Sequence, residues 1–470
     1  MILFGLEEST IIGLARNVRR GGREAEASTA PDTESGALEA ARAEPATAES
    51  ATAEPEMGES ETAECAEAEC VEASAEVFAR AAWTGIAEPG DGIAGLLVGS
   101  LGASAALVAV LDGWTPERLA AAVRETGRDG EDIGSAVDQG LQRWRPRLSS
   151  ADVIRSLQQA ARVSARLLIP SDPLWPAPCD DLGPHAPLAL WWRGVPEALT
   201  ALPTAVALVG ARAASGYGEH VAMEASAGLV DRGYAIVSGA AYGIDGMAHR
   251  AALASDGLTV AFLAGGVDRF YPSGHDQLLS RIATVGAVVS ELPCGAAPTK
   301  WRFLQRNRLI AASSAATVVI EAGWRSGSLN TAGHAAALGR PLGAVPGPVT
   351  SPTSAGCHRL IREFDAVCVT TAAEMAELAG CGPGNPELDD EGTEPGRSPG
   401  TEPRTSEQIR VLDALGGRSA RTVPDIARRA GMSTAAVLGA LGTLDLDGVV
   451  NERETGWVRA SRGGSAGGRS

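Results

Sequence analysis

The sequence predicts an α/β protein whose central part is a parallel sheet covered by helices on both faces. Between residues 204 and 345, short apolar segments rich in β-branched residues alternate with helical segments. Alternation of this kind is typical of parallel sheets, because each strand must be joined to the next by a crossover helix. Alanine-rich helical segments precede this part, and a small domain follows it after a polar linker.

The chain begins with residues 1–76, which we expect to be a mostly disordered, acidic, low-complexity segment. Between residues 21 and 76 there are sixteen acidic residues and two arginines, whereas the net charge of the whole chain is −18. The remainder is therefore close to neutral, and local basic clusters can still bind anions. Low hydrophobicity with high charge favours a solvated segment. A second hypothesis is an acidic mimic of nucleic acid.

Residues 77–165 are predicted to form a helical N-terminal domain, because apolar residues recur there at spacings of three and four. Residues 92–111 contain no charge, which raises the question of a membrane span. Glycine, alanine and serine make up over half of this stretch, and Asp91 and Asp112 flank it. We therefore expect two short buried helices, broken near Gly99, and no membrane association.

The seven cysteines are odd in number and contain no CxxC pair. A zinc site or a disulfide framework is therefore not expected, and a reducing cytoplasm fits the pattern. Residues 1–20 lack a basic start followed by a long apolar stretch, so no signal peptide is predicted. The sequence gives no reason to expect a metal or a cofactor.

Residues 166–380 are predicted to form the α/β domain. Its first part, residues 166–200, is rich in proline and tryptophan and resembles a linker that leads into the sheet. The expected strands are Val206–Val209, Ala235–Val237, Thr259–Leu263, Ala287–Val289, Thr317–Ile320 and Leu342–Val345. The expected helices are Tyr217–Asp231, Gly243–Ala254, Asp276–Ala283, Phe303–Ser313 and Leu329–Leu338.

After a linker at residues 381–404, residues 405–460 are predicted to form a winged-helix domain, followed by a flexible tail at 461–470. Three helical segments, Ser406–Leu415, Val423–Ala430 and Ser433–Leu446, precede two short apolar pairs that suggest a hairpin. The third segment would be the recognition helix, but it contains no lysine or arginine. Without such side chains it has nothing to offer phosphates or guanines. A protein-contact or regulatory role is favoured.

Small residues follow the predicted strands, at the sheet edge where open parallel sheets bind ligands. The first strand is followed by Gly210-Ala211-Arg212, the second by Ser238-Gly239, and the fifth leads to Ser326-Gly327-Ser328. Such turns let an anion approach backbone N–H groups at helix N-termini, and an arginine adds a bidentate phosphate contact. The pattern predicts an anion-binding crevice at this edge.

The only lysine of the chain, Lys300, opens a cluster of four cations within nine residues, interleaved with two aromatic residues. The cluster consists of Lys300, Trp301, Arg302, Phe303, Arg306 and Arg308. Cations neutralise phosphates, and aromatic rings stack on bases. An exposed helix start with two core aromatics would show the same pattern, but the neighbouring glycine turns favour nucleic-acid binding.

Motifs of several enzyme classes are absent from the sequence. The turn after the first strand does not match GxGxxG, and no GxxxxGK[ST] loop occurs. The six histidines are scattered, with no pattern that pairs one with a nucleophile. Asp245 is best explained as a residue at the start of a helix. A non-catalytic protein is therefore expected.

Seven motifs together resemble the DNA-processing protein A family (DprA, also called Smf), in order and with close spacing over residues 170–370. They are Val209-Gly210-Ala211-Arg212, Ser238-Gly239-x-Ala241-x-Gly243-Ile244-Asp245-x-x-Ala248-His249, Gly265-Gly266-x-Asp268-x-x-Tyr271-Pro272, Ser290-Glu291-x-Pro293, Phe303-x-x-Arg306-Asn307-Arg308-Leu309-Ile310-Ala311, Ser326-Gly327-Ser328-x-x-Thr331-Ala332 and Ala344-Val345-Pro346-Gly347. Leu304, Ala312 and His358 depart from the usual family residues.

The resemblance implies an extended Rossmann fold that binds single-stranded DNA, forms a homodimer and delivers the DNA to the recombinase RecA. It implies that Arg212, Lys300 and Arg306 hold phosphates while Phe303 stacks on a base. The other DNA-binding positions carried over are Gly210, Ala211, Ser238, Gly239 and Asn307. We therefore expect a recombination mediator that protects single-stranded DNA and loads RecA, as in DNA-mediated transformation.

Two other functions remain as hypotheses. One is a nucleotide-processing hydrolase of the lysine-decarboxylase-like Rossmann group, which uses a PGGxGTxxE-like loop. The comparable stretch, residues 321–331, lacks the glycine pair and the trailing glutamate. The other is a transcription regulator that binds duplex DNA through residues 405–460.

Overall fold

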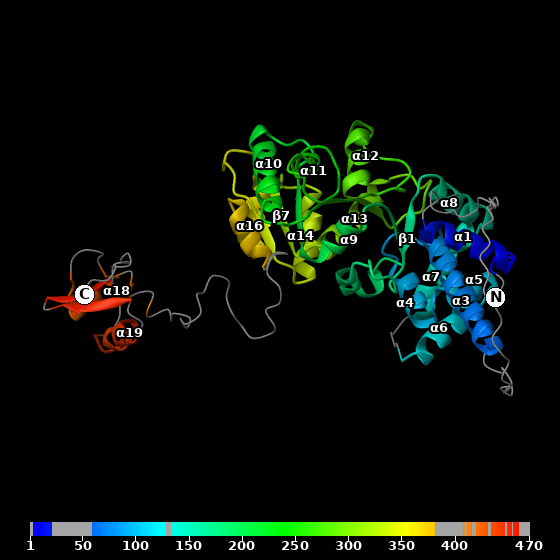
Figure 1. Ribbon diagram of the computed structural model, residues 1–470, viewed down its shortest axis with the longest axis horizontal. Coiled ribbons are helices and arrows are strands. Elements are labelled where there is room, and N and C mark those ends of the chain that lie inside the picture. The colour runs from blue at the N-terminus through cyan, green and yellow to red at the C-terminus, as the bar shows by residue number, and fades with distance from the viewer. Residues whose placement is uncertain are drawn as a thin grey trace, which may run out of the picture. The chain divides into compact units, whose positions relative to one another are not determined.

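The computed structural model describes residues 3–20, 59–127, 133–380 and most of 408–459 (Figure 1). Positions left out within the last range are 409–410, 413, 416–419, 431–433, 447–448 and 454. The chain divides into two compact units, Met1–Pro386 and Glu387–Ser470. The first unit contains the helical region together with the α/β domain, so these two share one packed body.

The helical region is built around a long helix, α3, against which the first helix of the chain packs. Its helices are α1 (Glu8–Arg20), α3 (Glu59–Ile86), α4 (Gly92–Leu101), α5 (Ala103–Leu111), α6 (Pro116–Glu125), α7 (Ile133–Trp144) and α8 (Ser150–Arg162). Trp83 of α3 and Trp144 of α7 are fully buried, with ring centroids 5.3 Å apart in an edge-to-face arrangement. Such aromatic pairs anchor a small helical core.

Helices α1 and α3 lie partly within the segment expected to be mostly disordered. Ile11, Ala15 and Val18 of α1 are buried, because their spacing places them on one face of the helix. The expectation of disorder is therefore wrong for α1, whose apolar stripe is short and precedes the acidic stretch. It is also wrong for residues 59–76, which form the first part of α3. Residues 21–58, for which disorder is also expected, lie outside the described residues.

The uncharged stretch at residues 92–111 forms two buried helices, α4 and α5, as expected. They meet at Gly102, three residues after the predicted break, and bend by 110°. Gly102 has φ +80°, a left-handed conformation that glycine adopts without strain. Within the described ranges, no single helix is long and apolar enough to cross a membrane. The bent pair α4 and α5 is long and apolar enough only when its two helices are taken together.

The α/β domain contains a nine-stranded sheet with the order β1-β2-β6-β5-β4-β3-β7-β8-β9. The strands are β1 (Arg166–Leu168), β2 (Leu190–Gly194), β3 (Val206–Gly210), β4 (Ile236–Ser238), β5 (Thr259–Phe262), β6 (Ala287–Ser290), β7 (Ala316–Glu321), β8 (Leu342–Ala344) and β9 (Val367–Cys368). Strands β3 to β9 pair in parallel, whereas β2 runs antiparallel to β6. The predicted α/β class with a Rossmann-like parallel sheet is confirmed.

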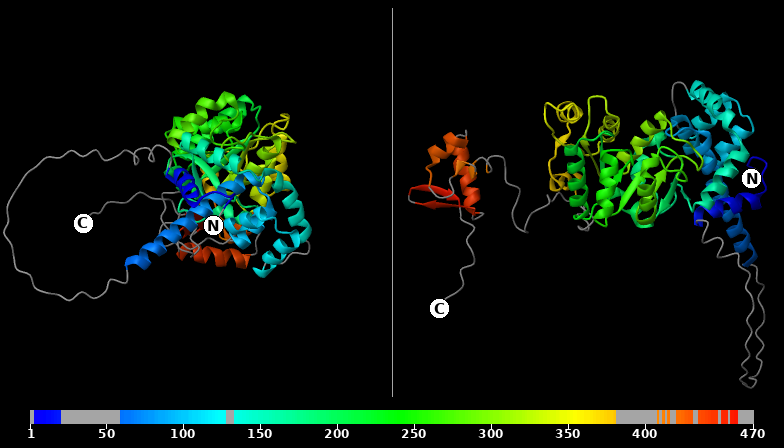
Figure 2. Two further views of the ribbon diagram at one scale, coloured as in Figure 1. Left: turned by 90° about the vertical axis from the view of Figure 1, so that its right-hand side faces the viewer. Right: turned by 90° about the horizontal axis from the view of Figure 1, so that it is seen from above.

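Helices cover both faces of this sheet (Figures 1 and 2). Alternate residues of a strand face opposite sides, so Val206 and Leu208 pack under one helix layer and Ala207 and Val209 under the other. The first layer contains α10 (Gly216–Val230), α11 (Ile244–Ala254), α12 (Asp276–Val285) and α16 (Ala372–Ala379). The second contains α9 (Pro196–Thr200), α13 (Lys300–Ala312), α14 (Ser328–Ala337) and α15 (Ala355–Glu363).

Residues 166–200 are part of the folded domain, so their interpretation as a linker is wrong. They form β1 and β2, which extend the sheet at one edge. Trp191 and Trp192 of β2 are buried, and the Trp191 indole donates a hydrogen bond of 3.1 Å to Thr84 on α3. The prolines flank short edge strands, a position that proline tolerates. This edge joins the sheet to the helical region.

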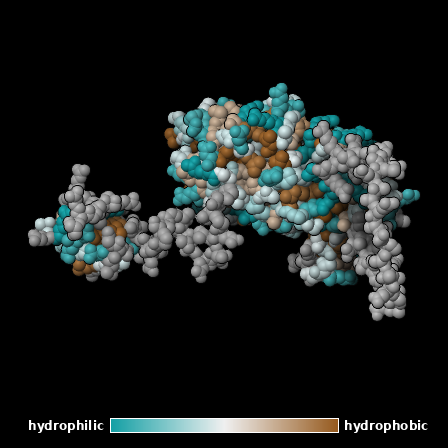
Figure 3. All heavy atoms as spheres, viewed as in Figure 1, coloured by the Kyte–Doolittle hydropathy of each residue, from teal (hydrophilic) through white to brown (hydrophobic). Residues whose placement is uncertain are grey.

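The surface of the first unit mixes hydrophilic and hydrophobic side chains. Hydrophobic residues gather over the middle of the α/β domain in the face shown in Figure 3. Several aromatic rings are about half exposed: Tyr242, Tyr271, Trp301 and Trp324. These four exposed rings are available for stacking or for contact with a partner.

The second unit is a winged-helix domain. Its described elements are α18 (Val423–Ala430), α19 (Thr434–Leu446), β10 (Val450–Arg453) and β11 (Gly456–Arg459). The two strands pair antiparallel, with Val450 opposite Arg459. Val437, Leu441 and Trp457 belong to its core. Helix α19 contains no lysine or arginine.

Candidate nucleic-acid interface

A crevice of about 500 Å³ opens at the carboxyl edge of the parallel strands, above β3 and β7. Its walls are the turn after β3, the first half of α13 and the turn before α14. Helices α10, α11 and α14 begin close to this edge, and helix N-termini favour anions. The crevice therefore lies where the sequence predicted it.

The turns after β3 and β4 pack against each other to form one end of the crevice. The Ile244 amide donates to the carbonyl of Ala211 at 3.2 Å. Gly243 has φ +75°, and a Cβ atom there would lie 2.2 Å from the same Ala211 oxygen. Only glycine allows this approach. The backbone at residues 210–212 is thus held in place by its contacts with Gly243 and Ile244.

An exposed cation and two aromatic rings meet at the mouth of the crevice. The guanidinium carbon of Arg212 lies 5.0 Å from the ring centroid of Phe303. The ring of Tyr271, which is half exposed, lies 5.6 Å from that of Phe303. Arg212 is exposed and has no ion-pair or hydrogen-bond partner among the described residues. This group offers a phosphate contact next to faces for base stacking.

Arg306 lines the same crevice but is buried, and much of its hydrogen-bonding capacity is used internally. Its Nη1 donates to the carbonyl oxygens of Gly239 at 2.6 Å and Phe262 at 2.5 Å. Burial lowers the pKa of Arg306 to about 10, while the nearby Asp245 opposes this shift. Arg306 therefore stays charged at neutral pH and ties α13 to the ends of β4 and β5.

Asp245, in the first turn of α11, lies beneath the crevice. Its carboxylate accepts a hydrogen bond of 3.3 Å from the Ala241 amide. Burial raises the pKa of Asp245, whereas the charge of Arg306 and backbone N–H groups act in the opposite direction. These contacts match the predicted role of a helix-start residue, which shapes the loop after β4.

The far wall of the crevice is formed by the turn that precedes α14. The Asn307 side chain donates from Nδ2 to Asn330 at 3.2 Å, which fastens α13 to α14. The hydroxyls of Ser326 and Ser328 lie 2.7 Å apart. Arg325 is exposed and, like Arg212, has no hydrogen-bond or ion-pair partner for its side chain in the described part of the chain. The two free arginines thus follow neighbouring strands.

The structure brings together six of the nine predicted DNA-binding residues. The crevice lining includes Gly210, Ala211, Arg212, Phe303, Arg306 and Asn307. The other three lie elsewhere: Ser238 is fully buried and donates to the Leu208 carbonyl at 2.7 Å, and Gly239 lies behind Arg306. Lys300 is exposed at the start of α13, outside the lining.

The cluster of four cations in α13 does not form one charged surface. Arg308 is buried and pairs with Glu291 through two contacts of 2.8 Å. Arg302 pairs with Glu88 of the helical region at 2.9 Å. Spacing along the chain cannot show this, because both partners are distant in sequence. With Arg306, which is buried and donates to two carbonyl oxygens, three of the four cations are therefore structural.

Sequence reasoning missed Tyr271 and Arg325 as candidate residues. Tyr271 appeared only as part of a motif, and nothing in its neighbourhood indicated that its ring would approach Phe303. Arg325 stands between Trp324 and the small residues 326–328, and a basic residue before such a turn was the available signal. Among the described residues, no group of histidine, cysteine or acidic side chains could hold a metal ion.

Comparison with known proteins identifies the family. A sequence model described as "DNA recombination-mediator protein A" matches residues 166–380, and one described as "DprA winged helix domain" matches residues 395–454. A putative DNA processing protein DprA from Mycobacterium tuberculosis is 46% identical over 334 residues, which cover 66% of this chain and 81% of the relative. The chain belongs to the DprA family.

Other DprA proteins agree with this assignment. DprA from Streptococcus pneumoniae is 40% identical over 193 residues, which cover 41% of this chain and 67% of that protein. An X-ray structure of DprA from the same organism aligns with a TM-score of 0.51 and 28% identity, over 64% of this chain and 97% of that one. The chain is thus a DNA-processing protein of the recombination-mediator family.

Proposed function

We propose that the crevice above β3 and β7 binds single-stranded DNA without turnover. The observation that carries this proposal is the grouping of an exposed arginine, Arg212, with the rings of Phe303 and Tyr271. A strand without a partner exposes both its phosphates and the faces of its bases, and this grouping offers a contact for each. Duplex DNA hides its base faces within the stack.

The bound state needs no chemistry, because neutralisation of phosphates and stacking of bases suffice to hold a strand. Arg212 and Arg325 would contact phosphates, and Phe303 would stack on a base. Arg306, Asn307 and the neighbouring turns would keep the crevice in shape, with Gly210 and Ala211 presenting backbone groups. Lys300 would add long-range attraction, while Ser238 and Gly239 would act from behind the crevice.

We further propose that the protein protects single-stranded DNA and loads RecA onto it, as a homodimer in the cytoplasm. Membership in a family of recombination mediators supports this role. A homodimer could hold two segments of one strand, which raises the effective concentration of the second contact. RecA loading is measured as the ATPase activity of RecA on strands coated with a single-strand-binding protein.

Binding is tested by fluorescence anisotropy of the full chain with labelled single-stranded and duplex oligonucleotides over a salt series. We expect tighter binding of the single strand and a linear fall of log affinity with log salt. Equal affinity for both forms would contradict the proposal. Incubation with nucleoside monophosphates, with detection of the released base, tests the hydrolase alternative in parallel.

The buried end of β7 gives no support to that alternative. The Glu321 carboxylate accepts hydrogen bonds from the amide and hydroxyl of Ser215, at 2.9 and 2.7 Å, and from Thr353 at 2.6 Å. All three contacts are made within the protein. Glu321 therefore supports the start of α10 and the loop before α15.

A further inference from the structure

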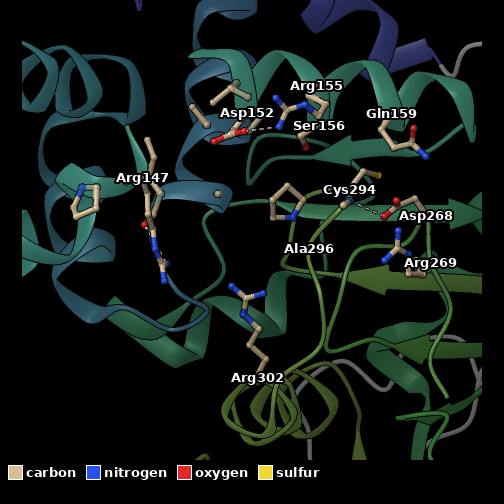
Figure 4. A pocket seen from close by; sticks show the side chains of 18 residues that line it. Arg147, Asp152, Arg155, Ser156, Gln159, Asp268, Arg269, Cys294, Ala296 and Arg302 are labelled. Carbon is tan, nitrogen blue, oxygen red and sulfur yellow. Dashed lines mark hydrogen bonds and ion pairs between the residues drawn. The ribbon is translucent and has the colours of Figure 1, made fainter. Parts of the chain in front are cut away.

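A second hollow, of about 640 Å³, lies between the helical region and the α/β domain. It is bounded by α3 and α8 on one side and by the loops after β5 and β6 on the other. Four arginines line it: Arg147, Arg155, Arg269 and Arg302. Figure 4 shows these side chains entering from different sides, with Arg155 on α8 and Arg302 opposite it. We call this hollow the junction pocket.

Cations outnumber acids in the junction pocket. The two acidic residues of its lining are Asp152 and Asp268. Behind the lining, Arg147 and Arg302 share one carboxylate, Glu88, at 2.8 and 2.9 Å. One carboxylate cannot neutralise two guanidinium groups, so positive charge remains. Hydrogen bonds and charge from Arg302 first, and from Arg147 second, lower the pKa of Glu88.

Two of the arginines are free to contact a ligand. Arg269 is exposed and has no hydrogen-bond or ion-pair partner for its side chain within the described ranges. Arg155 pairs with Asp152, but both side chains are well exposed, at 72% and 66%. Such a surface pair contributes little free energy and is easily exchanged for a phosphate. Gln159 lies one turn further along α8 and also faces the pocket.

The junction pocket and the crevice meet at two places along the chain. Arg302 belongs to the pocket and the next residue, Phe303, to the crevice. Arg269 lines the pocket, and Tyr271, two residues later, contacts Phe303. Adjacent Cα atoms are about 3.8 Å apart, so the linings of the two hollows come within one or two residues of each other.

Apolar side chains also line the pocket, Ile86 and Val153 from its helical side and Pro293 from the loop after β6. A ligand that suits this pocket carries anionic groups for the arginines and a flat, less polar part for these side chains. The nucleoside phosphate unit has both. Its source is either a DNA strand that continues from the crevice or a free nucleotide.

We propose that the junction pocket binds a further segment of the DNA strand held in the crevice, through Arg155, Gln159 and Arg269. This inference rests on the function proposed for the crevice. It assigns a DNA contact to the helical region. The binding site then runs from the turn after β3, across the start of α13, to α8.

The proposal is tested with the full chain and the double variant Arg155→Ala/Arg269→Ala. Labelled oligothymidylates of about 4 to about 16 nucleotides cover the site sizes known for grooves that bind single strands. We expect unchanged affinity for the shortest strand and a loss of roughly tenfold for the longest at physiological salt. The salt slope for the longest strand should fall by about two.

The matched control is Arg124→Ala/Arg232→Ala, which removes two exposed arginines that line neither hollow. An equal loss in this control would overturn the proposal, because overall charge would explain both results. Thermal unfolding by circular dichroism verifies that each variant is folded. Since all four side chains are at the surface, we expect their melting temperatures to match.

The outcomes separate this proposal from that of the crevice. If Arg212→Ala weakens binding at every length while Arg155→Ala/Arg269→Ala matches wild type, only the junction pocket is refuted. If wild type binds no strand at all, the proposed function itself fails. Calorimetric binding of thymidine monophosphate that the double variant loses, with unchanged affinity for long strands, would assign the pocket to a free nucleotide and overturn the strand proposal.

Discussion

The two ends of helix α13 carry similar residues in opposite environments. At its start, Lys300 and Trp301 are exposed, the latter by 57%. Two turns later, Arg306 and Arg308 are buried and bonded to other parts of the protein. The start of the helix can exchange its contacts for those of a ligand, whereas the later part cannot without disturbing the fold. Positive charge is therefore exposed at the start of the helix and used for stability in its later part.

The largest effect is expected from Arg308→Ala. This change leaves Glu291 as a buried carboxylate without its partner, which costs about 3–5 kcal/mol. The free energy of unfolding from urea titration should fall by this amount. The variant Arg308→Met/Glu291→Leu removes both charges and should recover much of the loss. A loss below about 1 kcal/mol for the single variant would show that the ion pair is not a structural element.

Arg306→Met should have the next largest effect. It removes the donor to two buried carbonyl oxygens, at a cost of about 1.5–3 kcal/mol. It also removes the charge that opposes the raised pKa of Asp245. An acid with a raised pKa in the folded state loses stability as the pH rises through that pKa. The deficit relative to wild type should therefore be larger at pH 7 than at pH 5.

Urea titrations of both proteins at the two pH values measure this difference. A deficit independent of pH would show that Arg306 and Asp245 do not interact. DNA affinity, measured where the variant is folded, should also fall, because the turn after β4 would lose its support. An unchanged affinity would mean that this turn does not shape the site.

Much of the fold could be predicted because strands and helices of the central sheet have local signatures. Each of the six expected strands lies within two residues of an observed one, since buried parallel strands are short apolar runs. Strands β1, β2 and β9 were missed. The tryptophans of β2 stand among prolines, and no period reveals this strand. Their burial depends on Thr84 and the rest of α3, which lie about 100 residues away in sequence.

The site was predicted less completely than the fold. Turns after strands predict which backbone meets at the sheet edge, and this placed Arg212 and the start of α13 together. Pairing of a cation with a distant acid leaves no local signal, so the sequence could not show that Arg302 and Arg308 pair with Glu88 and Glu291. Tyr271 was missed for the same reason, since its contact with Phe303 spans two separate loops.

Phe303→Ala separates the binding end of α13 from its structural end. Loss of one base stack should weaken single-stranded DNA binding by about 1–3 kcal/mol, on the order of tenfold. Stability should change little by comparison with the two arginine variants. Phe364→Ala, which removes a partly exposed ring near Arg359, is the control. Anisotropy titrations showing equal affinity for both variants would contradict a stacking role for Phe303.

Arg212→Ala should have a smaller effect that is visible mainly in the salt dependence. Removal of one phosphate contact should weaken binding about threefold and reduce the salt slope by about one. The free energy of unfolding should stay the same, because this side chain stacks only on Phe303. Arg232→Ala, which removes an exposed arginine just after α10 and outside the crevice, serves as control. An unaltered slope in Arg212→Ala would remove it from the site.

Lys300→Ala should have the smallest effect, although it removes the only lysine of the chain. Lys300 is exposed but lies outside the crevice lining, and salt weakens the attraction of an exposed charge that makes no direct contact. Affinity should fall by less than about twofold at physiological salt and somewhat more at low salt. The double variant Arg212→Ala/Lys300→Ala should therefore resemble Arg212→Ala in anisotropy titrations. If Lys300→Ala instead lowered the salt slope as much as Arg212→Ala, this would contradict the prediction. The strand would then contact the first turn of α13 directly, and Lys300 would belong to the binding site.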